Sequence, residues 1–163
     1  MHIKGGNGSG KSTLLRIILG ITSPSKGFVE THAQDLNISY LGHKNAIKNY
    51  LTPLENLELL FNDAELKIAF EWLRKFGLFD LQDELTASLS YGQQKKLALI
   101  RVLARSSDLI ILDEPLVGLD QATADQLTSF LIQKLSEGVS LILTSHINPM
   151  IDCRVLNLGA NGA

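Results

Sequence analysis

Apolar residues follow two different periods along the chain, and the changes of period mark the predicted elements. Short, mostly apolar runs at residues 109–112 and 139–144 are typical of strands that are covered on both faces. Weaker alternation predicts further strands at residues 28–31, 36–41 and 154–158. Between these strands the apolar spacing becomes helical. Strands that alternate with helices indicate an α/β fold, with a parallel sheet and helices on both of its faces.

Local end signals mark the predicted helices. Thr52 is a natural N-cap, Pro53 suits the first helical position, and Glu55 completes a capping box. One predicted helix begins directly after Thr52. The other predicted helices cover residues 12–19, 64–76, 93–104 and 121–137. Residues 50–106 contain no predicted strand, so we expect them to form a helical insertion in the α/β core.

Composition narrows the classes of function. With 163 residues, 45% of them hydrophobic and 20% charged, the chain can form one domain with a substantial core. The net charge of −2 argues against a strongly basic surface for nucleic acid. Cys153 is the sole cysteine, so no internal disulfide can form, and a reducing compartment fits. No apolar run is long enough to cross a bilayer, and we expect a soluble, cytoplasmic domain.

A phosphate-binding loop is predicted near the start of the chain. The segment GGNGSGKS, residues 5–12, matches the pattern G-x-x-x-x-G-K-[ST] in full. Glycines let backbone N–H groups surround phosphate oxygens, and the following helix adds roughly half a positive charge at its N-terminus. Lys11 is expected to reach the β and γ phosphates of a nucleoside triphosphate, and Ser12 to ligate Mg²⁺. The alternative is a flexible glycine-rich turn before an ordinary helix. The predicted nucleotide-binding residues are Gly5, Gly6, Asn7, Gly8, Ser9, Gly10, Lys11, Ser12 and Thr13.

Two adjacent acids, Asp113 and Glu114, follow the apolar run LIIL. Ligands of open α/β sheets bind at the carboxyl ends of the strands, which is where this pair is expected. Asp113 would hold Mg²⁺ directly or through water, and Glu114 would act as general base on the attacking water. The alternative is a solvated strand end. A glutamate here favours hydrolysis and weighs against a GTPase, which typically positions water with glutamine.

The segment LSYGQ, Leu89 to Gln93, predicts a second anion-binding helix N-terminus. LSYGQ stands upstream of LIILDEP, in the order that is typical of the ABC-type ATPases. Nearly the whole chain resembles that family. In that family two ATPase domains face each other head to tail. The resemblance implies that Ser90, Gly92 and Gln93 contact the ATP held by the phosphate loop of a partner subunit. It also implies that an isolated monomer hydrolyses ATP poorly.

Further matches and departures follow in the order of that family. Asp120, in GLD, resembles the loop that contacts the opposite subunit, and His146, in LTSH, resembles the catalytic switch histidine at the γ-phosphate. His43 stands where glutamine usually couples Mg²⁺ to the transmembrane partner; it could contact water or metal, or shape the loop. Gly6 replaces the usual proline of the phosphate loop. The segment LSYGQ resembles the signature motif of the family, and Tyr91 replaces the first glycine of that signature.

The segments YLGH and LTPLENL, with Lys48 between them, resemble the ATP-binding subunits of the haem exporters of cytochrome c maturation. That resemblance implies an ATPase that drives integral-membrane subunits from the cytoplasmic face of the inner membrane. It also implies that this chain pairs with a second ATPase subunit of the same kind. It implies that this chain itself neither ligates haem nor binds nucleic acid directly. The exporters either move haem or release it from a membrane-bound chaperone. The alternatives are a soluble ABC ATPase outside transport, or a nucleotide-binding module without turnover.

The expected fold is therefore a P-loop NTPase core with a parallel sheet and an inserted helical subdomain at about residues 50–106. We expect residues 1–163 to form a single ATPase domain that lacks its N-terminal edge strands, because family members carry further residues before the phosphate loop. Such a loss would expose a sheet edge. It would also remove an aromatic ring from adenine, which weakens binding by about 1–3 kcal/mol.

Overall fold

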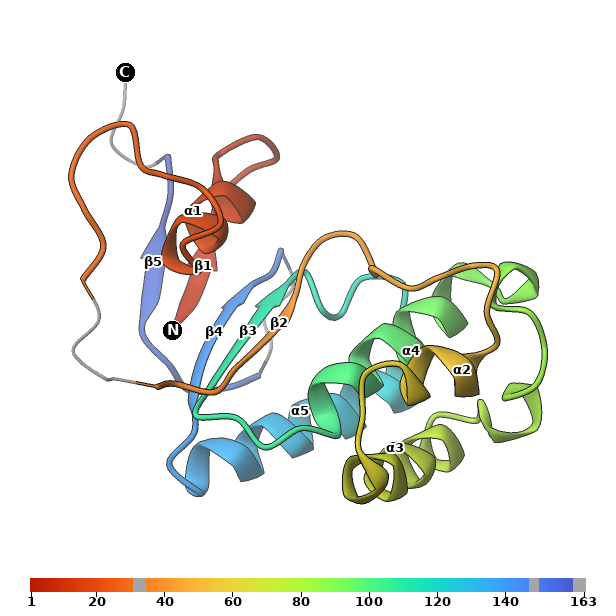
Figure 1. Cartoon of the computed structure of the whole chain (residues 1–163). Helices are drawn as coiled ribbons and strands as arrows, with labels where there is room; N and C mark the ends of the chain where they lie inside the picture. The colour runs from red at the N-terminus through yellow and green to blue at the C-terminus, as the bar shows by residue number, and fades with distance from the viewer. Residues whose placement is uncertain (31–34, 147–149, 160–163) are drawn as a thin grey trace. The chain divides into compact units, whose positions relative to one another are not determined.

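The computed structural model describes residues 1–30, 35–146 and 150–159. Within these ranges one sheet holds five strands in the order β2-β3-β4-β1-β5, and every neighbouring pair is parallel, as predicted (Figure 1). The strands are β1 (His2–Lys4), β2 (Ile38–Leu41), β3 (Leu109–Asp113), β4 (Ser140–Thr144) and β5 (Val155–Asn157).

Helices α2, α3 and α4 each begin at a capping box, which side chains close to one another in the sequence form. The predicted capping box of Thr52 and Glu55 is present, with reciprocal bonds of 2.8 and 3.2 Å. The box of Ser90 and Gln93 places the start of its helix two residues before the predicted one. The helices are α1 (Lys11–Ile18), α2 (Pro53–Glu58), α3 (Asp63–Lys75), α4 (Tyr91–Leu103) and α5 (Gln121–Ser136), with short 3₁₀ turns η1 (Phe79–Leu81) and η2 (Thr86–Ser88).

The strand predicted at residues 28–31 is wrong where the structure describes it. Residues 28–30 are irregular, and residue 31 lies outside the described ranges. The Phe28 side chain is 84% exposed, so it has no sheet face to pack against. Apolar alternation alone does not make a strand, because β-propensity mostly measures packing against neighbouring strands.

The chain divides into two compact units. The first consists of Met1–His43, Ser107–Leu116 and Phe130–Ala163 and contains the sheet and α1. The second consists of Lys44–Ser106 and Val117–Ser129 and contains α2, α3 and α4. The proposed helical subdomain at residues 50–106 falls in the second unit. No helix of the described ranges is long and apolar enough to span a membrane.

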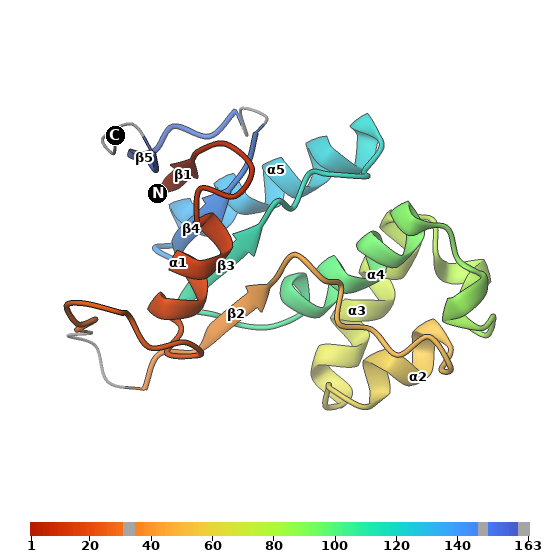
Figure 2. The same cartoon turned by 90° about the horizontal axis from the view of Figure 1, so that it is seen from above.

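The core of the first unit fixes the start of α1. Ile3 of β1, Leu15 of α1 and Ile111 of β3 are fully buried in one cluster, and α1 lies over the strands (Figure 2). Burial of such a side chain stabilises the fold by about 1.5–3 kcal/mol. Because β1 and α1 are joined by residues 5–10, this packing holds the glycine-rich loop at the carboxyl end of the sheet.

Candidate functional site

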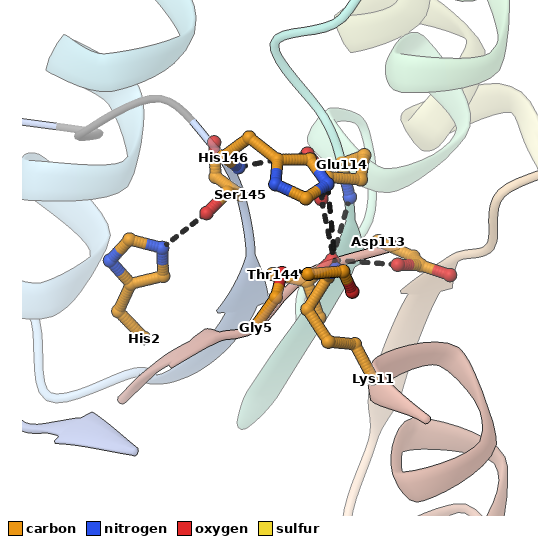
Figure 3. Close-up of polar contacts among 9 residues, drawn as sticks. His2, Gly5, Lys11, Asp113, Glu114, Thr144, Ser145 and His146 are labelled. Atoms are coloured by element: carbon orange, nitrogen blue, oxygen red, sulfur yellow. Dashed lines mark hydrogen bonds and ion pairs between the residues drawn. The ribbon is translucent and has the colours of Figure 1, made fainter. Parts of the chain in front are cut away.

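A cavity of about 320 Å³ lies at the carboxyl ends of the strands in the first unit. The structure brings together there the glycine loop, the acid pair and two histidines that the sequence singled out, His43 and His146. Figure 3 shows Lys11, the acid pair and His146 of this group. The lining residues are Asn7, Gly8, Ser9, Gly10, Lys11, Ser12, Thr13, His43, Asp113, Glu114 and His146.

The loop before α1 has the backbone that a phosphate cradle requires. Gly8 and Gly10 have φ of 79° and 91°, a left-handed conformation that side chains rarely adopt. At Gly5 an added Cβ would lie 2.4 Å from Ser9 Oγ and 2.9 Å from the Leu158 carbonyl oxygen, so close packing also demands glycine. No side chain of the described ranges caps the start of α1 at Gly10, and no acid stands in its first turn. The positive end of α1 is thus left for an anion from outside the chain.

Lys11 lies over the loop with its ammonium directed at acceptors. Its Nζ donates to the carbonyls of Gly5 and Gly6, at 2.9 and 3.1 Å. It lies 3.4 Å from His146 Nε2 and 3.9 Å from Glu114 Oε1. The cation therefore sits between the glycine loop and the acid pair, where the phosphates of a nucleotide would meet both.

Asp113 is the last residue of β3, and Glu114 directly after it has an unusual backbone conformation. Asp113 is 1% exposed, and Glu114 has a left-handed φ of 49°. Such a conformation costs about 1–3 kcal/mol in a residue other than glycine, and it turns the Glu114 side chain out of the strand pattern. In the described part of the chain, Asp113 Oδ2 is buried without a hydrogen-bond partner, and Glu114 Oε1 is buried with only the ion-pair contacts to Lys11 and His146. Buried carboxylate oxygens of this kind are suited to a cation or a water molecule.

His146 contacts Glu114 with both its backbone and its ring. The backbone N–H donates to Glu114 Oε2 at 3.2 Å, and ring Nε2 lies 3.3 Å from Oε1. The ring is half exposed at the cavity, so it can contact a ligand there while it stays beside the acid.

His43 lies two residues after the end of β2 and lines the cavity. An added Cβ at Gly42 would lie 2.7 Å from the Tyr40 hydroxyl, so the phenol ring folds over the glycine. Burial, and then the negative charge of Asp113, raise the pKa of the Tyr40 phenol above its usual value. The motif YLGH thus places a neutral phenol within the electrostatic influence of Asp113 and leaves the histidine at the cavity.

The signature residues lie in the second unit and act there as a helix start. Ser90 Oγ accepts from the Gln93 N–H at 3.3 Å, and Gln93 Oε1 accepts from the Ser90 N–H at 2.8 Å. Gly92 lacks space for a side chain, since an added Cβ would lie 2.8 Å from the Gly118 carbonyl oxygen. The Tyr91 ring packs against Gly118 as well. The turn before α4 is therefore built against the loop that leads to Asp120.

Asp120 is held within the second unit by groups that the sequence prediction missed. Its carboxylate accepts from Lys96 Nζ at 2.6 Å and from the N–H and hydroxyl of Thr123 at 2.8 Å each. The hydrogen bond from Lys96 is the largest cause of a pKa well below the usual range for this carboxyl. Another missed residue is Thr144, whose hydroxyl contacts the acid pair. Only the strand register that places Thr144 opposite Asp113 indicates this contact, and that register cannot be predicted from the sequence.

Comparisons with known proteins agree with this geometry. The family model described as ABC transporter matches residues 1–117. The cytochrome c biogenesis ATP-binding export protein CcmA of Idiomarina loihiensis is 39% identical over 156 residues, which cover 89% of this chain and 72% of that protein. The protein of the same name from Escherichia coli is 37% identical over 155 residues, covering 90% of this chain and 75% of that one.

Solved structures show the same fold. An ATP-binding subunit of an ABC transporter superposes with a TM-score of 0.80 at 25% identity, covering 90% of this chain and 67% of that one. The ATP-binding cassette MJ0796, in a dimeric post-hydrolysis state bound to ADP and Pi, gives 0.74 at 27% identity, covering 90% and 74%. The chain therefore belongs to the ABC transporter family, as an ATP-hydrolysing ABC ATPase related to the cytochrome c biogenesis proteins CcmA.

Proposed function

We propose that this chain is the ATP-hydrolysing subunit of a haem export complex for cytochrome c maturation, in which closure of two ATP sites moves membrane subunits. The observation that carries the catalytic part is the cavity in which Lys11, Glu114 and His146 meet at the start of α1, which no side chain of the described residues caps. The names of the CcmA relatives support the assignment to cytochrome c biogenesis.

ATP would bind with its phosphates at the glycine loop. The N–H groups at the start of α1 attract the phosphate oxygens, and Lys11 exchanges its contacts with the loop carbonyls for contacts with the β and γ phosphates. The residues proposed to bind nucleotide are the predicted ones, Gly5 to Thr13.

The cavity also fits Mg²⁺. The Ser12 hydroxyl and Asp113 Oδ2, which has no hydrogen-bond partner among the described residues, are oxygen donors of the kind that Mg²⁺ prefers. When bound, the ion would neutralise part of the negative charge on the β and γ phosphates.

Glu114 is proposed as the general base. Its carboxylate takes a proton from the attacking water, whose oxygen bonds to the γ phosphorus as the bond to the bridging β–γ oxygen breaks. ADP and phosphate leave. His146 already holds the Glu114 carboxylate and lies at the cavity, so it can orient the γ-phosphate beside the base.

A second copy of this subunit would complete each site. Ser90, Gly92 and Gln93 would meet the partner's ATP, and Asp120 would lie at the contact between subunits. The dimeric state of the MJ0796 structure supports this arrangement. The two units of the chain then act as one ATPase domain, bound peripherally to membrane subunits at the cytoplasmic face. His43 would lie where the site responds to them, and no direct haem or nucleic-acid contact is proposed.

The test of catalysis is Mg-ATP hydrolysis as a function of protein concentration, with membrane subunits added in a parallel series. Glu114→Gln should keep ATP binding and lower hydrolysis by about 10²–10⁴-fold, the usual worth of a general base. Lys11→Ala should lose ATP binding itself. Hydrolysis that persists unchanged in Glu114→Gln would remove the proposed base.

The test of the shared site is a mixture of two inactive variants. Ser90→Arg damages only the turn, and Lys11→Ala damages only the loop. In a head-to-tail dimer of the two, one site combines an intact loop with an intact turn, so mixing should restore activity. A mixture as inactive as its components would argue against sharing. Copurification with membrane proteins distinguishes a transporter subunit from a soluble ATPase.

A further inference from the structure

Thr144 connects both acids of the site, although no motif marks it. It is the last residue of β4, it is fully buried, and it lies opposite Asp113 in the parallel pairing of β3 and β4. Its hydroxyl donates to Asp113 Oδ1 at 2.6 Å and accepts from the Glu114 N–H at 2.9 Å (Figure 3). One hydroxyl therefore uses its single proton on one acid and a lone pair on the other.

The bond to Asp113 selects which carboxylate oxygen keeps its lone pairs for a ligand. Oδ1 is occupied by the Thr144 hydroxyl, whereas Oδ2 is buried with no hydrogen-bond partner in the described part of the chain. Without the hydroxyl, rotation of the carboxylate could exchange the two oxygens. Mg²⁺ accepts little deviation from octahedral geometry, so a fixed donor oxygen favours its binding.

The bond to Glu114 holds a backbone that is not intrinsically favoured. The Glu114 N–H is shared between the Thr144 hydroxyl and the Thr144 carbonyl oxygen, at 2.9 and 3.2 Å. Together they hold the left-handed φ of 49°. The His146 N–H binds the side chain of the same glutamate at 3.2 Å. Thr144 at the end of β4 and His146 just after it thus hydrogen-bond to Glu114 at its backbone and at its carboxylate, respectively.

We propose that Thr144 is a positioning residue for the acid pair: its hydroxyl directs Asp113 Oδ2 toward the metal and keeps Glu114 in its left-handed conformation. This inference rests on the proposed Mg-nucleotide site. It assigns the metal affinity of the site to a residue that touches neither nucleotide nor metal. Outer groups that orient metal ligands typically change metal affinity by about 10–100-fold when they are removed.

Two matched pairs isolate the hydroxyl. The wild-type chain and Thr144→Val differ by the hydroxyl at nearly constant volume. Thr144→Ser and Thr144→Ala differ by the hydroxyl in a smaller side chain. If Thr144→Val does not fold, the Ser/Ala pair carries the comparison. ADP is the nucleotide and Mn²⁺ the metal, so that no hydrolysis is needed. Measured are Mn²⁺ affinity in the presence of ADP, by electron paramagnetic resonance, and ADP affinity in EDTA.

Loss of the hydroxyl should weaken Mn²⁺ binding about tenfold or more within each folded pair, while ADP affinity in EDTA stays within about twofold. A purely structural tie between β3 and β4 would change thermal stability and leave Mn²⁺ affinity unchanged, and that result would overturn the inference. If the wild-type chain itself shows no binding of Mn²⁺ with ADP, the proposed metal–nucleotide site fails, and the role of Thr144 fails with it. The wild-type measurement therefore separates the two failures.

Discussion

Asn56 holds together the segment that follows His43 in the chain, and its removal should be costly. It is 4% exposed, and its Oδ1 accepts from the Lys48 N–H at 2.8 Å. Its amide lies 3.0 Å from the carbonyl oxygens of Lys48 and Thr52 and 3.2 Å from Thr86 Oγ1. Because the amide has two N–H bonds for three acceptors, the side chain makes about three full hydrogen bonds.

The magnitude follows from that count. At about 1 kcal/mol net per bond, with some further cost for buried groups left unpaired, Asn56→Ala should lose about 3–4 kcal/mol of unfolding free energy. That is a large part of the roughly 5–15 kcal/mol available to a domain. The matched control is Asn62→Ala, the exposed N-cap of α3, where Asn62 Oδ1 accepts two bonds of 3.0 Å. Loss of such a cap costs about 1 kcal/mol.

Urea unfolding of both variants, followed by circular dichroism, measures the difference. The reasoning requires Asn56→Ala to unfold at a clearly lower urea concentration than Asn62→Ala, with similar slopes. Equal losses would show that burial and bond count do not set the cost. They would refute the assignment of Asn56 as the centre of this network.

Two further predictions concern single contacts. His2 is 2% exposed, and its Nε2 lies 3.0 Å from the Ser145 carbonyl oxygen. His2→Leu should lower the urea midpoint of unfolding more than His2→Gln, because glutamine keeps an N–H donor. Equal midpoints would contradict the contact. Lys96→Met should raise the pKa of Asp120 toward 3.8, measured by carboxyl NMR titration, and an unshifted pKa would refute the ion pair. Since the folded pKa of Asp120 lies below 3.8, this carboxylate favours folding above that pH, and its contribution is lost as the pH falls toward the folded value. The Asp120 side chain is half exposed, so the pKa reports the pair better than stability does.

The elements that sequence predicted well are those with local signals at their ends. The start of α2 was predicted from Thr52, Pro53 and Glu55 alone, because a capping box needs only neighbours in the chain. The strand at residues 28–31 failed over its described part for the opposite reason. A strand depends on a partner distant in sequence, and alternation does not reveal whether one is present.

The site divides in the same way. The carboxyl ends of parallel strands meet at one edge, so the gathering of Lys11, Asp113 and His146 could be predicted from their places after strands and at a helix start. The role of Thr144 could not, because it depends on the register of β3 against β4. A shift of one residue would turn its side chain to the other face and leave the acid pair without this hydroxyl.

The helices differ in whether a side chain caps their first turn, and the sequence at each helix start indicates this difference. Thr52, Asn62 and Ser90 each form a capping box, whereas α1 begins at Gly10 without a side-chain cap in the described ranges. An uncapped start beside a cavity is a preformed anion site. At α4, by contrast, Gln93 already occupies the Ser90 N–H at 2.8 Å, so a phosphate there must compete with the cap. In the proposed dimer this difference orders the events: ATP binds first at the loop before α1, and the turn before α4 engages it only when the partner subunit closes.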